Sequence, residues 1–563
     1  MPATIDNIEL HVKAYRSALK SNMEVTVNSL TPPHLKMESI LHPLGKDTAK
    51  IDTSALVYSL LRLPYEIDQT ELVIMGQNPE VFSEAGYPSV TSWPRLTTRA
   101  RRRPIHLDSA THTLAYFIGS VSDIDDIVNI LIAYQWEWNK LHQLLQLKYP
   151  DITAFTTALK KTTLASDLKI SPSDFSNLTK SFGKNLANRL ENIYRCPQNL
   201  RLRLLAGSWI DYTKTVQHWY KNLAKTTGNH GVHLSQSNIY FVSSNSHSLL
   251  NTITGFPLSL KKELLSLLKK DSSPLLDTWD KIQKKEIFIS ESDFLYYVFR
   301  NYQSLPEIKA KFSAIQQKLG IISAPSAHYL DVNAQIFPIS SLARQTASAV
   351  GADPRLKISK KSKLDKSESF IVNIDYPLGF AAYLVLNELF ENVKNVNGVY
   401  ILGKAAVLNS EVGDIEIPKL VFDEHTQNTY MFKNCFNSFF PYTNNRGSTL
   451  TNQKAVSLLG TFLQNDALIK KYLENNITVV EMESGPYLSS ITEITYDQQY
   501  PQGTIVDLNS APLDLGIINY TSDTPYSQAT NLGAGSLDLN GLEPVYLGTL
   551  AILQRIINLE EQK

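Results

Sequence analysis

Two apolar segments of the sequence end in carboxylates that could do chemistry. Residues 479–483 read VVEME, and residues 515–523 read LGIINYTSD. In an open α/β sheet, ligands bind beyond the carboxyl ends of the strands. We therefore expect Glu483 and Asp523 to meet a substrate at one edge of a sheet. A solvated acid or a helix cap explains either residue alone equally well.

Two further motifs precede these acids in the chain. Residues 402–409 read LGKAAVLN, and residues 411–418 read EVGDIEIP. Four elements follow one another in the chain: the Gly403-Lys404 loop, the VGDIEIP element, VEME and SD. Their order and approximate spacing are those of the nucleoside phosphorylase and nucleosidase superfamily. The chain resembles that superfamily over about residues 335–560.

The resemblance implies a role for each matching residue. Asp523 would be the general acid that protonates the purine ring nitrogen, because an unprotonated base is a poor leaving group. Glu483 would bind the ribose hydroxyls and stabilise an oxocarbenium-like sugar. Met482 would pack against the sugar, and Phe462 would stack on the base. Ser522 and the Gly-rich loop would contribute further substrate contacts.

Departures from the superfamily pattern bear on the nucleophile. Phosphorolytic members hold phosphate with an Arg and a Ser, at positions where this chain has Ile401 and Lys404; the Arg that often precedes SD is replaced near Asn519. Phosphate needs several donors and a fixed positive charge. We therefore predict cleavage by water. The alternative is phosphorolysis, with Lys404 and Arg344 holding phosphate, although a surface ion pair is the more common role for a residue such as Arg344.

Three other segments are weaker candidates. By the same resemblance, His425, in the polar run DEHTQNTY at 423–430, would contact the substrate, although a solvated loop residue is the more common case. Asp375 is the nearest strand-end acid that could activate a water. Residues 531–536 read NLGAGS but lack the Lys-Ser/Thr pair of a P-loop, so we expect a lid or a turn there.

The apolar periodicity divides the chain near residue 330. Before this point, apolar residues recur at threes and fours, for example in 8–22, 122–147 and 200–223, which predicts a mainly α-helical region over 1–330, as one or two subdomains. After it, short β-branched runs alternate with helical patterns. This alternation predicts an α/β domain over 331–563, with a central mixed, largely parallel sheet flanked by helices, as in nucleoside phosphorylases. The expected strands are 335–339, 370–374, 398–402, 477–480 and 515–520.

The N-terminal region has three possible roles: it regulates, it oligomerises, or it completes the substrate pocket. The run RARRR at 99–103 is either an ion-paired cluster or an anion site. No Ser/His/Asp triad can be assembled from spacing, so hydrolysis of that type has no support in the sequence.

Composition excludes several classes of protein. The 563 residues carry 54 Lys+Arg and 54 Asp+Glu, which removes the positive field of a general nucleic-acid binder. Cys196 and Cys435 fit no zinc or disulfide spacing, and no apolar run approaches the roughly 20 residues that span a membrane. We expect a cytoplasmic nucleosidase or phosphorylase that takes a purine nucleoside or nucleotide and needs no cofactor or metal. By resemblance it would be a homo-oligomer; a non-catalytic nucleotide sensor is the competing hypothesis.

Overall fold

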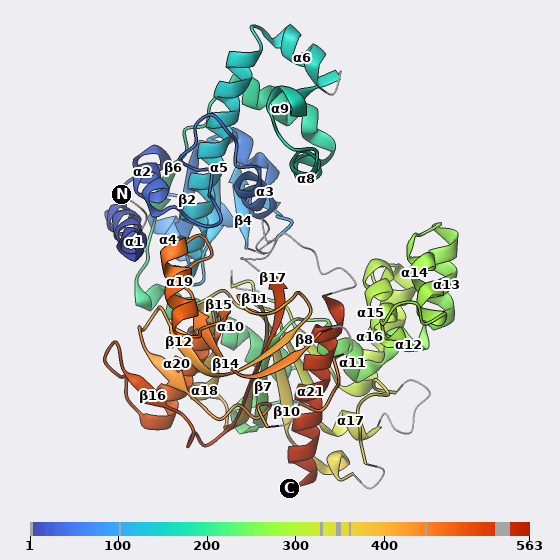
Figure 1. Cartoon of the computed structure of the whole chain (residues 1–563). Helices are drawn as coiled ribbons and strands as arrows, with labels where there is room; N and C mark the ends of the chain where they lie inside the picture. The colour runs from blue at the N-terminus through green and yellow to red at the C-terminus, as the bar shows by residue number, and fades with distance from the viewer. Residues whose placement is uncertain are drawn as a thin grey trace.

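The computed structural model describes most of the chain. The described residues are 4–100, 103–160, 163–326, 330–344, 351–359, 362–438, 440–444, 447–523 and 541–563, without the side chains of Lys160, Lys184, Arg344 and Asp523. Two β-sheets organise these residues, and each is covered by helices (Figure 1). The segment 531–536, expected to be a lid or turn, lies outside the described residues.

The N-terminal sheet has six strands in the order β1-β6-β2-β5-β4-β3. At its centre, β2 runs parallel to both β5 and β6, and every residue of β2 is buried, as is typical of a strand covered on both faces. The bounds are β1 Val25–Thr26, β2 Leu72–Gly76, β3 Arg95–Leu96, β4 Ile105–Asp108, β5 Thr113–Phe117 and β6 Arg201–Leu204.

Helices pack on this sheet around the long helix α5 (Val121–Lys148). Its first turn is fixed by the Asp123 carboxylate, which accepts the backbone N–H groups of Gly119 at 2.7 Å and Ser120 at 3.3 Å. The neighbouring helices include α1 Ile5–Leu19, α2 Val27–Met37, α3 Thr53–Arg62, α8 Pro172–Phe182 and α9 Leu186–Arg195.

The N-terminal part is therefore not a purely helical region. Its strands have only two to five residues, and so short an apolar run has no periodicity that separates a strand from a helix. The segment 200–223, expected to be one helix, is strand β6 followed by helix α10 (Trp209–Gly228).

The second sheet is mixed and larger. Its main path runs β16-β13-β12-β14-β15-β11-β7-β10-β9-β8, and β17 pairs with β11 and β12. The long strand β11 is parallel to β7 and β17 and antiparallel to β15, which confirms the predicted mixed central sheet with flanking helices. The bounds are β7 Asn238–Ser244, β8 Ile322–Ala324, β9 Ala334–Pro338, β10 Phe370–Asp375, β11 Asn395–Val407, β12 Ile415–Asp423, β13 Thr429–Met431, β14 Thr449–Ser457, β15 Val479–Glu481, β16 Ile505–Asp507 and β17 Asp514–Asp523.

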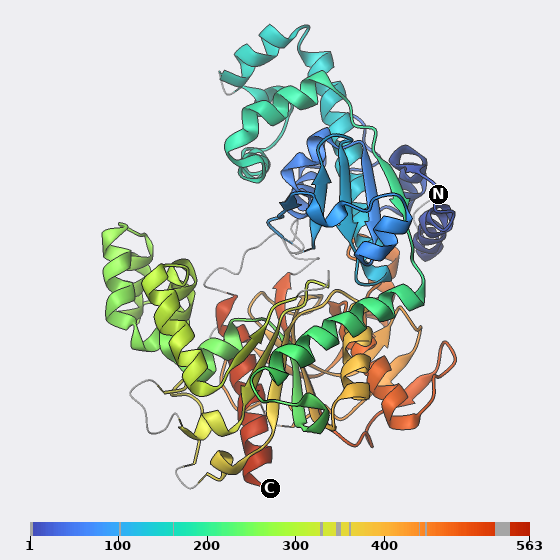
Figure 2. The same cartoon turned by 180° about the vertical axis from the view of Figure 1, so that it is seen from behind.

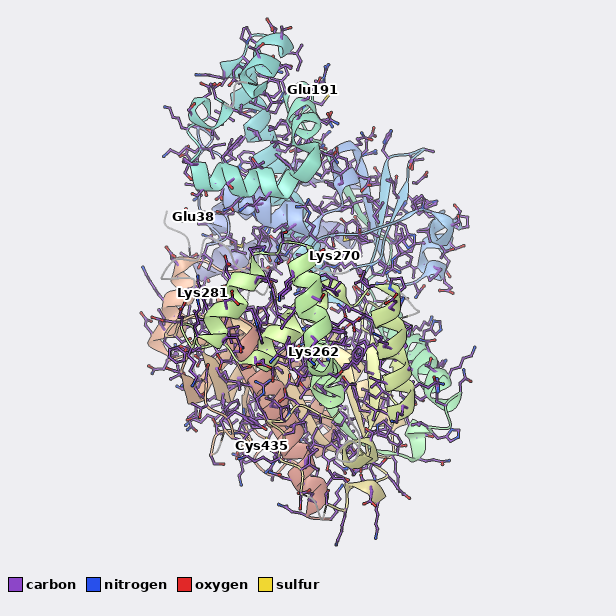
Figure 3. All side chains as sticks on the ribbon, turned by 90° about the vertical axis from the view of Figure 1, so that its right-hand side faces the viewer. Glu38, Glu191, Lys262, Lys270, Lys281 and Cys435 are labelled. Carbon is purple, nitrogen blue, oxygen red and sulfur yellow. The ribbon has the colours of Figure 1, made fainter. Side chains whose placement is uncertain are left out.

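This sheet begins earlier in the chain than the expected boundary at 331, because β7 lies between β10 and β11. A helical insertion follows β7, and Figure 3 shows it in front, with Lys262, Lys270 and Lys281 labelled. The insertion contains α12 Phe256–Ser259, α13 Lys261–Lys270, α14 Leu275–Gln283, α15 Glu291–Tyr302 and α16 Pro306–Leu319. The sequence pattern did not reveal that this helical segment interrupts a sheet.

Helices cover both faces of the second sheet (Figure 2). One face packs against α10, α18 (Ala381–Asn392) and α20 (Ser484–Tyr496), and its apolar core continues into the N-terminal sheet. The other face packs against α11 (Ser248–Thr254) and α21 (Leu542–Glu561). None of the helices in the described part of the chain combines the length and apolar character needed to cross a bilayer.

The N-terminal part sits over the carboxyl ends of β7, β10 and β11 (Figure 1). The segment before α19 (Asp466–Glu474) holds the two parts together: the Asn465 amide donates to the backbone carbonyl of Met37 at 3.2 Å, and the Gln464 carbonyl accepts from the Ile40 N–H at 3.0 Å. The Tyr58 and Thr461 hydroxyls are 2.8 Å apart. The space beneath these contacts is the site described next.

Candidate active site

A cavity of about 470 Å³ lies between the two sheets. Its floor is formed by the strand ends of the second sheet, including Asp375, Lys404, Glu483 and Ser522. Its roof comes from the N-terminal part, with Tyr58, Arg62, Arg103, Phe117 and Asp123. Both halves of the molecule are therefore needed to enclose it.

Glu481 holds the strand-to-helix turn that presents the acidic motif. Its carboxylate accepts the backbone N–H groups of Glu483 and Ser484, each at 2.7 Å, and the hydroxyl of Ser457. Burial raises the pKa of the Glu481 carboxyl, and these hydrogen bonds oppose that shift. Glu481 thus caps helix α20, so the next acid, Glu483, is left to face the cavity.

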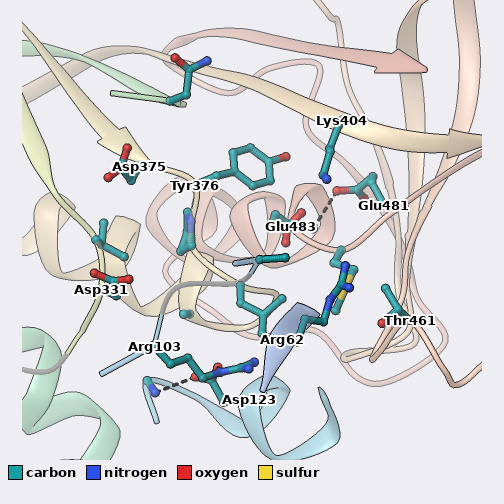
Figure 4. A pocket seen from close by; sticks show the side chains of 18 of the residues that line it. Arg62, Arg103, Asp123, Asp331, Asp375, Tyr376, Lys404, Thr461, Glu481 and Glu483 are labelled. Atoms are coloured by element: carbon teal, nitrogen blue, oxygen red, sulfur yellow. Dashed lines mark hydrogen bonds and ion pairs between the residues drawn. The ribbon is translucent and has the colours of Figure 1, made fainter. Parts of the chain in front are cut away.

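Glu483 is buried, with 7% of its surface exposed, and its carboxyl group points into the cavity (Figure 4). Its Oε1 accepts the backbone N–H of Gly379 at 3.2 Å. Gly379 has φ +51°, and a Cβ there would lie 2.3 Å from the Ser122 hydroxyl, so glycine is required in this loop. The loop after β10 therefore fixes the Glu483 carboxylate from the side.

Several of the residues predicted from the sequence meet in this cavity. Glu483, Met482, Lys404 and Ser522 all line it, and Figure 4 shows Lys404 directed to the same space as Glu483. Asp523 is the last residue of β17, and its backbone pairs with Ala406 of β11; its side chain lies outside what the structure describes. Ala406 also pairs with Val480, so β11 separates the strand ends that lead to Glu483 and Asp523.

Gly403 and Asp375 hold positions beside the cavity. A Cβ at Gly403 would lie 2.0 Å from the Tyr376 hydroxyl, so Gly403 leaves room for that ring. Asp375, at the end of β10, lines the cavity and accepts a hydrogen bond from the Asn333 amide at 2.7 Å.

Two predicted residues lie away from the cavity. Phe462 is 1% exposed and packs edge-on against the Tyr58 ring, with centroids 5.3 Å apart, so it is a core residue. Arg344 ends α17 (Ser340–Arg344), which follows β9. Because β9 is antiparallel to β10, Pro338 pairs with Phe370 at the amino end of β10, whereas the cavity lies at its carboxyl end. The backbone of Arg344 is thus at the opposite edge of the sheet.

His425 is held between Asp423 and Ser122. Its Nδ1 lies 2.9 Å from the Asp423 carboxylate, and its Nε2 lies 3.2 Å from the Ser122 hydroxyl. The three residues have the connectivity of a hydrolytic triad, which sequence spacing did not suggest. However, Ser122 is fully buried, and none of the three is among the described residues that line the cavity. The His425 side chain is only 4% exposed, and its contacts with Asp423 and Ser122 bridge the two halves of the molecule.

Comparison with models of known protein families assigns most of the chain to a family. A model of the family of unknown function DUF6909 matches residues 27–558. The chain belongs to this family. No curated protein matches it.

Among solved structures, partial similarity is found to two enzymes. One is a 5′-methylthioadenosine/S-adenosylhomocysteine nucleosidase from Colwellia psychrerythraea in complex with adenine, with 14% identity, 44% of this chain and 88% of that chain covered, and a TM-score of 0.26. The other is a purine nucleoside phosphorylase from Toxoplasma gondii in complex with immucillin-H, with 9% identity, coverage of 43% and 84%, and a TM-score of 0.26.

In this DUF6909 chain, the described arginines of the run at 99–103 make different contacts. The Arg103 guanidinium is buried and forms ion pairs with Asp123 at 2.6 Å and Asp126 at 2.7 Å. Arg99 donates to the backbone carbonyl of Lys180 at 2.7 Å. Arg101 and Arg102 lie outside the described residues. For Arg103 the ion-paired interpretation of the run is therefore the correct one.

Carboxylates outnumber lysine and arginine side chains around the cavity of this DUF6909 chain. Among the described residues that line it, the carboxylates are Asp123, Asp331, Asp375, Glu481 and Glu483, and the cations are Arg62, Arg103 and Lys404. The Arg62 guanidinium also lies over the Tyr58 ring, 3.5 Å from its centroid, and donates to the Tyr58 carbonyl. Apart from Arg103, which belongs to the RARRR run, sequence reasoning missed the roof residues and Tyr376, because no motif marks them.

Proposed function

We propose that this cavity binds a purine nucleoside and that the protein cleaves its N-glycosidic bond with water. The observation that carries the proposal is the Glu483 carboxylate, which is buried just after the end of β15 and directed into a cavity of about 470 Å³ between the two sheets. A carboxylate can accept hydrogen bonds from the sugar hydroxyls and stabilise positive charge on the sugar. Met482 lines the cavity beside it and offers an apolar surface to the pentose.

The proposed reaction has one bond broken and one formed. The bond between the anomeric carbon and the purine nitrogen breaks, and its electron pair stays on the base. Asp523 donates a proton to the base as it leaves, and Glu483 stabilises the oxocarbenium-like sugar. Water then adds to the anomeric carbon and loses a proton. Asp375, which lines the cavity, is the proposed acceptor of that proton.

Two features support water over phosphate. Carboxylates outnumber cations among the described lining residues, which opposes binding of a phosphate dianion. Arg103 is already neutralised by two ion pairs, and the helix that carries Arg344 lies at the other edge of the sheet. Phosphorolysis is the second candidate reaction, and in it Lys404, which lines the cavity, would contact the phosphate.

We propose that the N-terminal part completes the substrate pocket. Tyr58, Arg62 and Phe117 line the cavity from its roof, which supports a part that completes the substrate pocket. Its removal would open the cavity to solvent.

The test is release of free base from a panel of purine nucleosides and nucleotides, with and without phosphate. Base without phosphate supports hydrolysis, base only with phosphate supports phosphorolysis, and binding without base release supports the sensor. Asp523→Asn and Glu483→Gln should each lower kcat/KM by about 100-fold or more. Glu493→Gln is the matched control, because Glu493 lies on helix α20, which follows the acidic motif, and its carboxylate accepts from the Tyr383 hydroxyl away from the cavity. Full turnover by the Asp523 and Glu483 variants would overturn the assignment.

A further inference from the structure

We propose that the Tyr376 hydroxyl donates a hydrogen bond to a sugar hydroxyl of the bound nucleoside, and so selects ribosides over deoxyribosides that lack this group. The inference builds on the proposed function, because it names the substrate class of the same cavity. Four observations on Tyr376 lead to it.

First, the Tyr376 hydroxyl is buried without a hydrogen-bond partner in the part of the chain that the structure describes. Tyr376 follows β10 directly and lines the cavity, and Figure 4 shows its ring among Lys404, Glu481 and Glu483. A buried hydroxyl with no partner costs stability, so an unsatisfied donor at a cavity wall indicates a ligand that completes it.

Second, the chain makes room for this hydroxyl at a specific point. An added Cβ at Gly403 would lie 2.0 Å from the Tyr376 hydroxyl and 2.5 Å from the ring carbon that bears it. Any other residue at 403 would push the ring out of its position. The ring is therefore seated against β11, the strand that also carries Lys404.

Third, the surroundings determine what the hydroxyl does. Burial, followed by the nearby charges of Glu483 and Glu481, raises the pKa of Tyr376 well above its ordinary value, so the phenol keeps its proton and donates. The same two carboxylates repel an anionic acceptor. The acceptor that fits is a neutral oxygen.

Fourth, one loop holds Tyr376 and Glu483 together. Gly379, three residues after Tyr376, donates its N–H to the Glu483 carboxylate at 3.2 Å. A sugar hydroxyl both donates and accepts, so one hydroxyl can donate to Glu483 and accept from Tyr376. A hydrogen at that position satisfies neither group, and sites built around a substrate hydroxyl reject analogues that lack it.

The experiment compares adenosine with 2′-deoxyadenosine and 3′-deoxyadenosine, for the wild type, Tyr376→Phe and Tyr116→Phe. Tyr116 is the matched control, because its hydroxyl is also buried without a partner among the described residues but does not line the cavity. We expect Tyr376→Phe to reduce the preference in kcat/KM for adenosine over one of the two deoxynucleosides by about tenfold or more. Tyr116→Phe should leave both preferences unchanged.

Binding of the same three nucleosides, measured by calorimetry, separates this inference from the proposed reaction. Binding with the expected preference but no base release would overturn the proposed cleavage and support the role of Tyr376. Base release with preferences that Tyr376→Phe does not change would overturn the role of Tyr376 alone. Absence of both binding and release would overturn both.

Discussion

The hydroxyl of Ser122 lies 3.2 Å from Nε2 of His425, although 303 residues separate them in the chain. Ser122 begins the long helix α5 of the N-terminal part, and His425 follows β12 of the second sheet. The same hydroxyl accepts the backbone N–H of Phe380 at 2.9 Å. This one side chain thus ties the roof of the cavity to the loop that bears Tyr376 and Gly379.

We predict that Ser122→Ala destabilises the protein and that Ser122 of the wild type does not react with a serine-directed reagent. The variant leaves the Phe380 N–H and the buried imidazole without their partner, which should lower the free energy of unfolding by about 1–3 kcal/mol. Urea denaturation measures this, with the exposed Ser21→Ala as control. Because Ser122 is fully buried, a fluorophosphonate should not modify the wild type. Labelling at Ser122 would instead identify the triad as a catalytic nucleophile site.

The fit between Gly403 and Tyr376 predicts a double-mutant effect. Gly403→Ala places a methyl group 2.0 Å from the Tyr376 hydroxyl, so we expect a loss of about 1–3 kcal/mol in unfolding free energy. In a Tyr376→Ala background the ring is gone, and the Gly403→Ala substitution should then have little effect. The measurement is a double-mutant cycle by chemical denaturation. An equal loss in both backgrounds would show that the close approach does not govern position 403.

Much of the second sheet could be predicted from local sequence, because its strands are short β-branched runs between helical patterns. The runs 370–374 and 515–520 correspond to β10 and β17. The place of β7 could not be predicted, since pairing of Asn238–Ser244 with β10 depends on contacts across more than a hundred residues. The strands of the N-terminal part were missed, because runs as short as Arg201–Leu204 resemble a helical turn.

The candidate site also contains residues that the sequence predicts and residues that only the tertiary structure reveals. Glu483 follows the end of β15 and Lys404 lies within β11; a motif in the sequence marks each of them, and both line the cavity. Arg62 and Tyr58 line it only because α3 packs over the second sheet, which the Tyr58–Thr461 contact illustrates. His425 was a reasonable candidate by its polar neighbours, but its bridging partner lies in the other half of the molecule.

The buried Glu416 predicts a loss of stability as the pH rises from 4.5 to about 7. It is fully buried on β12 and pairs across strands with the fully buried Asn519. Burial raises the pKa of its carboxyl from 4.5 to about 7. The folded state therefore binds more protons than the unfolded state between these values, so stability is greatest below pH 4.5 for this group and falls as the pH rises through 7. The total is about 3 kcal/mol.

Glu416→Gln tests this assignment. The amide does not titrate, so the unfolding free energy of the variant should change less between pH 5 and pH 8 than that of the wild type. The difference between the two proteins isolates Glu416 from other titrating groups. Parallel pH profiles would contradict the prediction.

The buried histidines of the N-terminal part predict the opposite dependence at acidic pH. His11 bonds Asn129 at 2.8 Å, and His34 bonds the same Asn129 oxygen at 3.1 Å and His42 at 3.1 Å. Burial lowers the pKa of His11 from 6.5 to about 4 and lowers that of His34 well below its ordinary value. The unfolded state then binds more protons between pH 6.5 and pH 4, so stability falls as the pH drops through this window.

For His11 alone the loss amounts to about 3 kcal/mol at pH 4 relative to pH 7. His11→Gln should therefore flatten the acid limb of the stability profile, measured by urea denaturation from pH 7 to pH 4. The exposed His230→Gln serves as control and should follow the wild type. If His11→Gln kept the full acid sensitivity, the loss would have to come from His34 or from the carboxylates, because His11 would no longer contribute a proton.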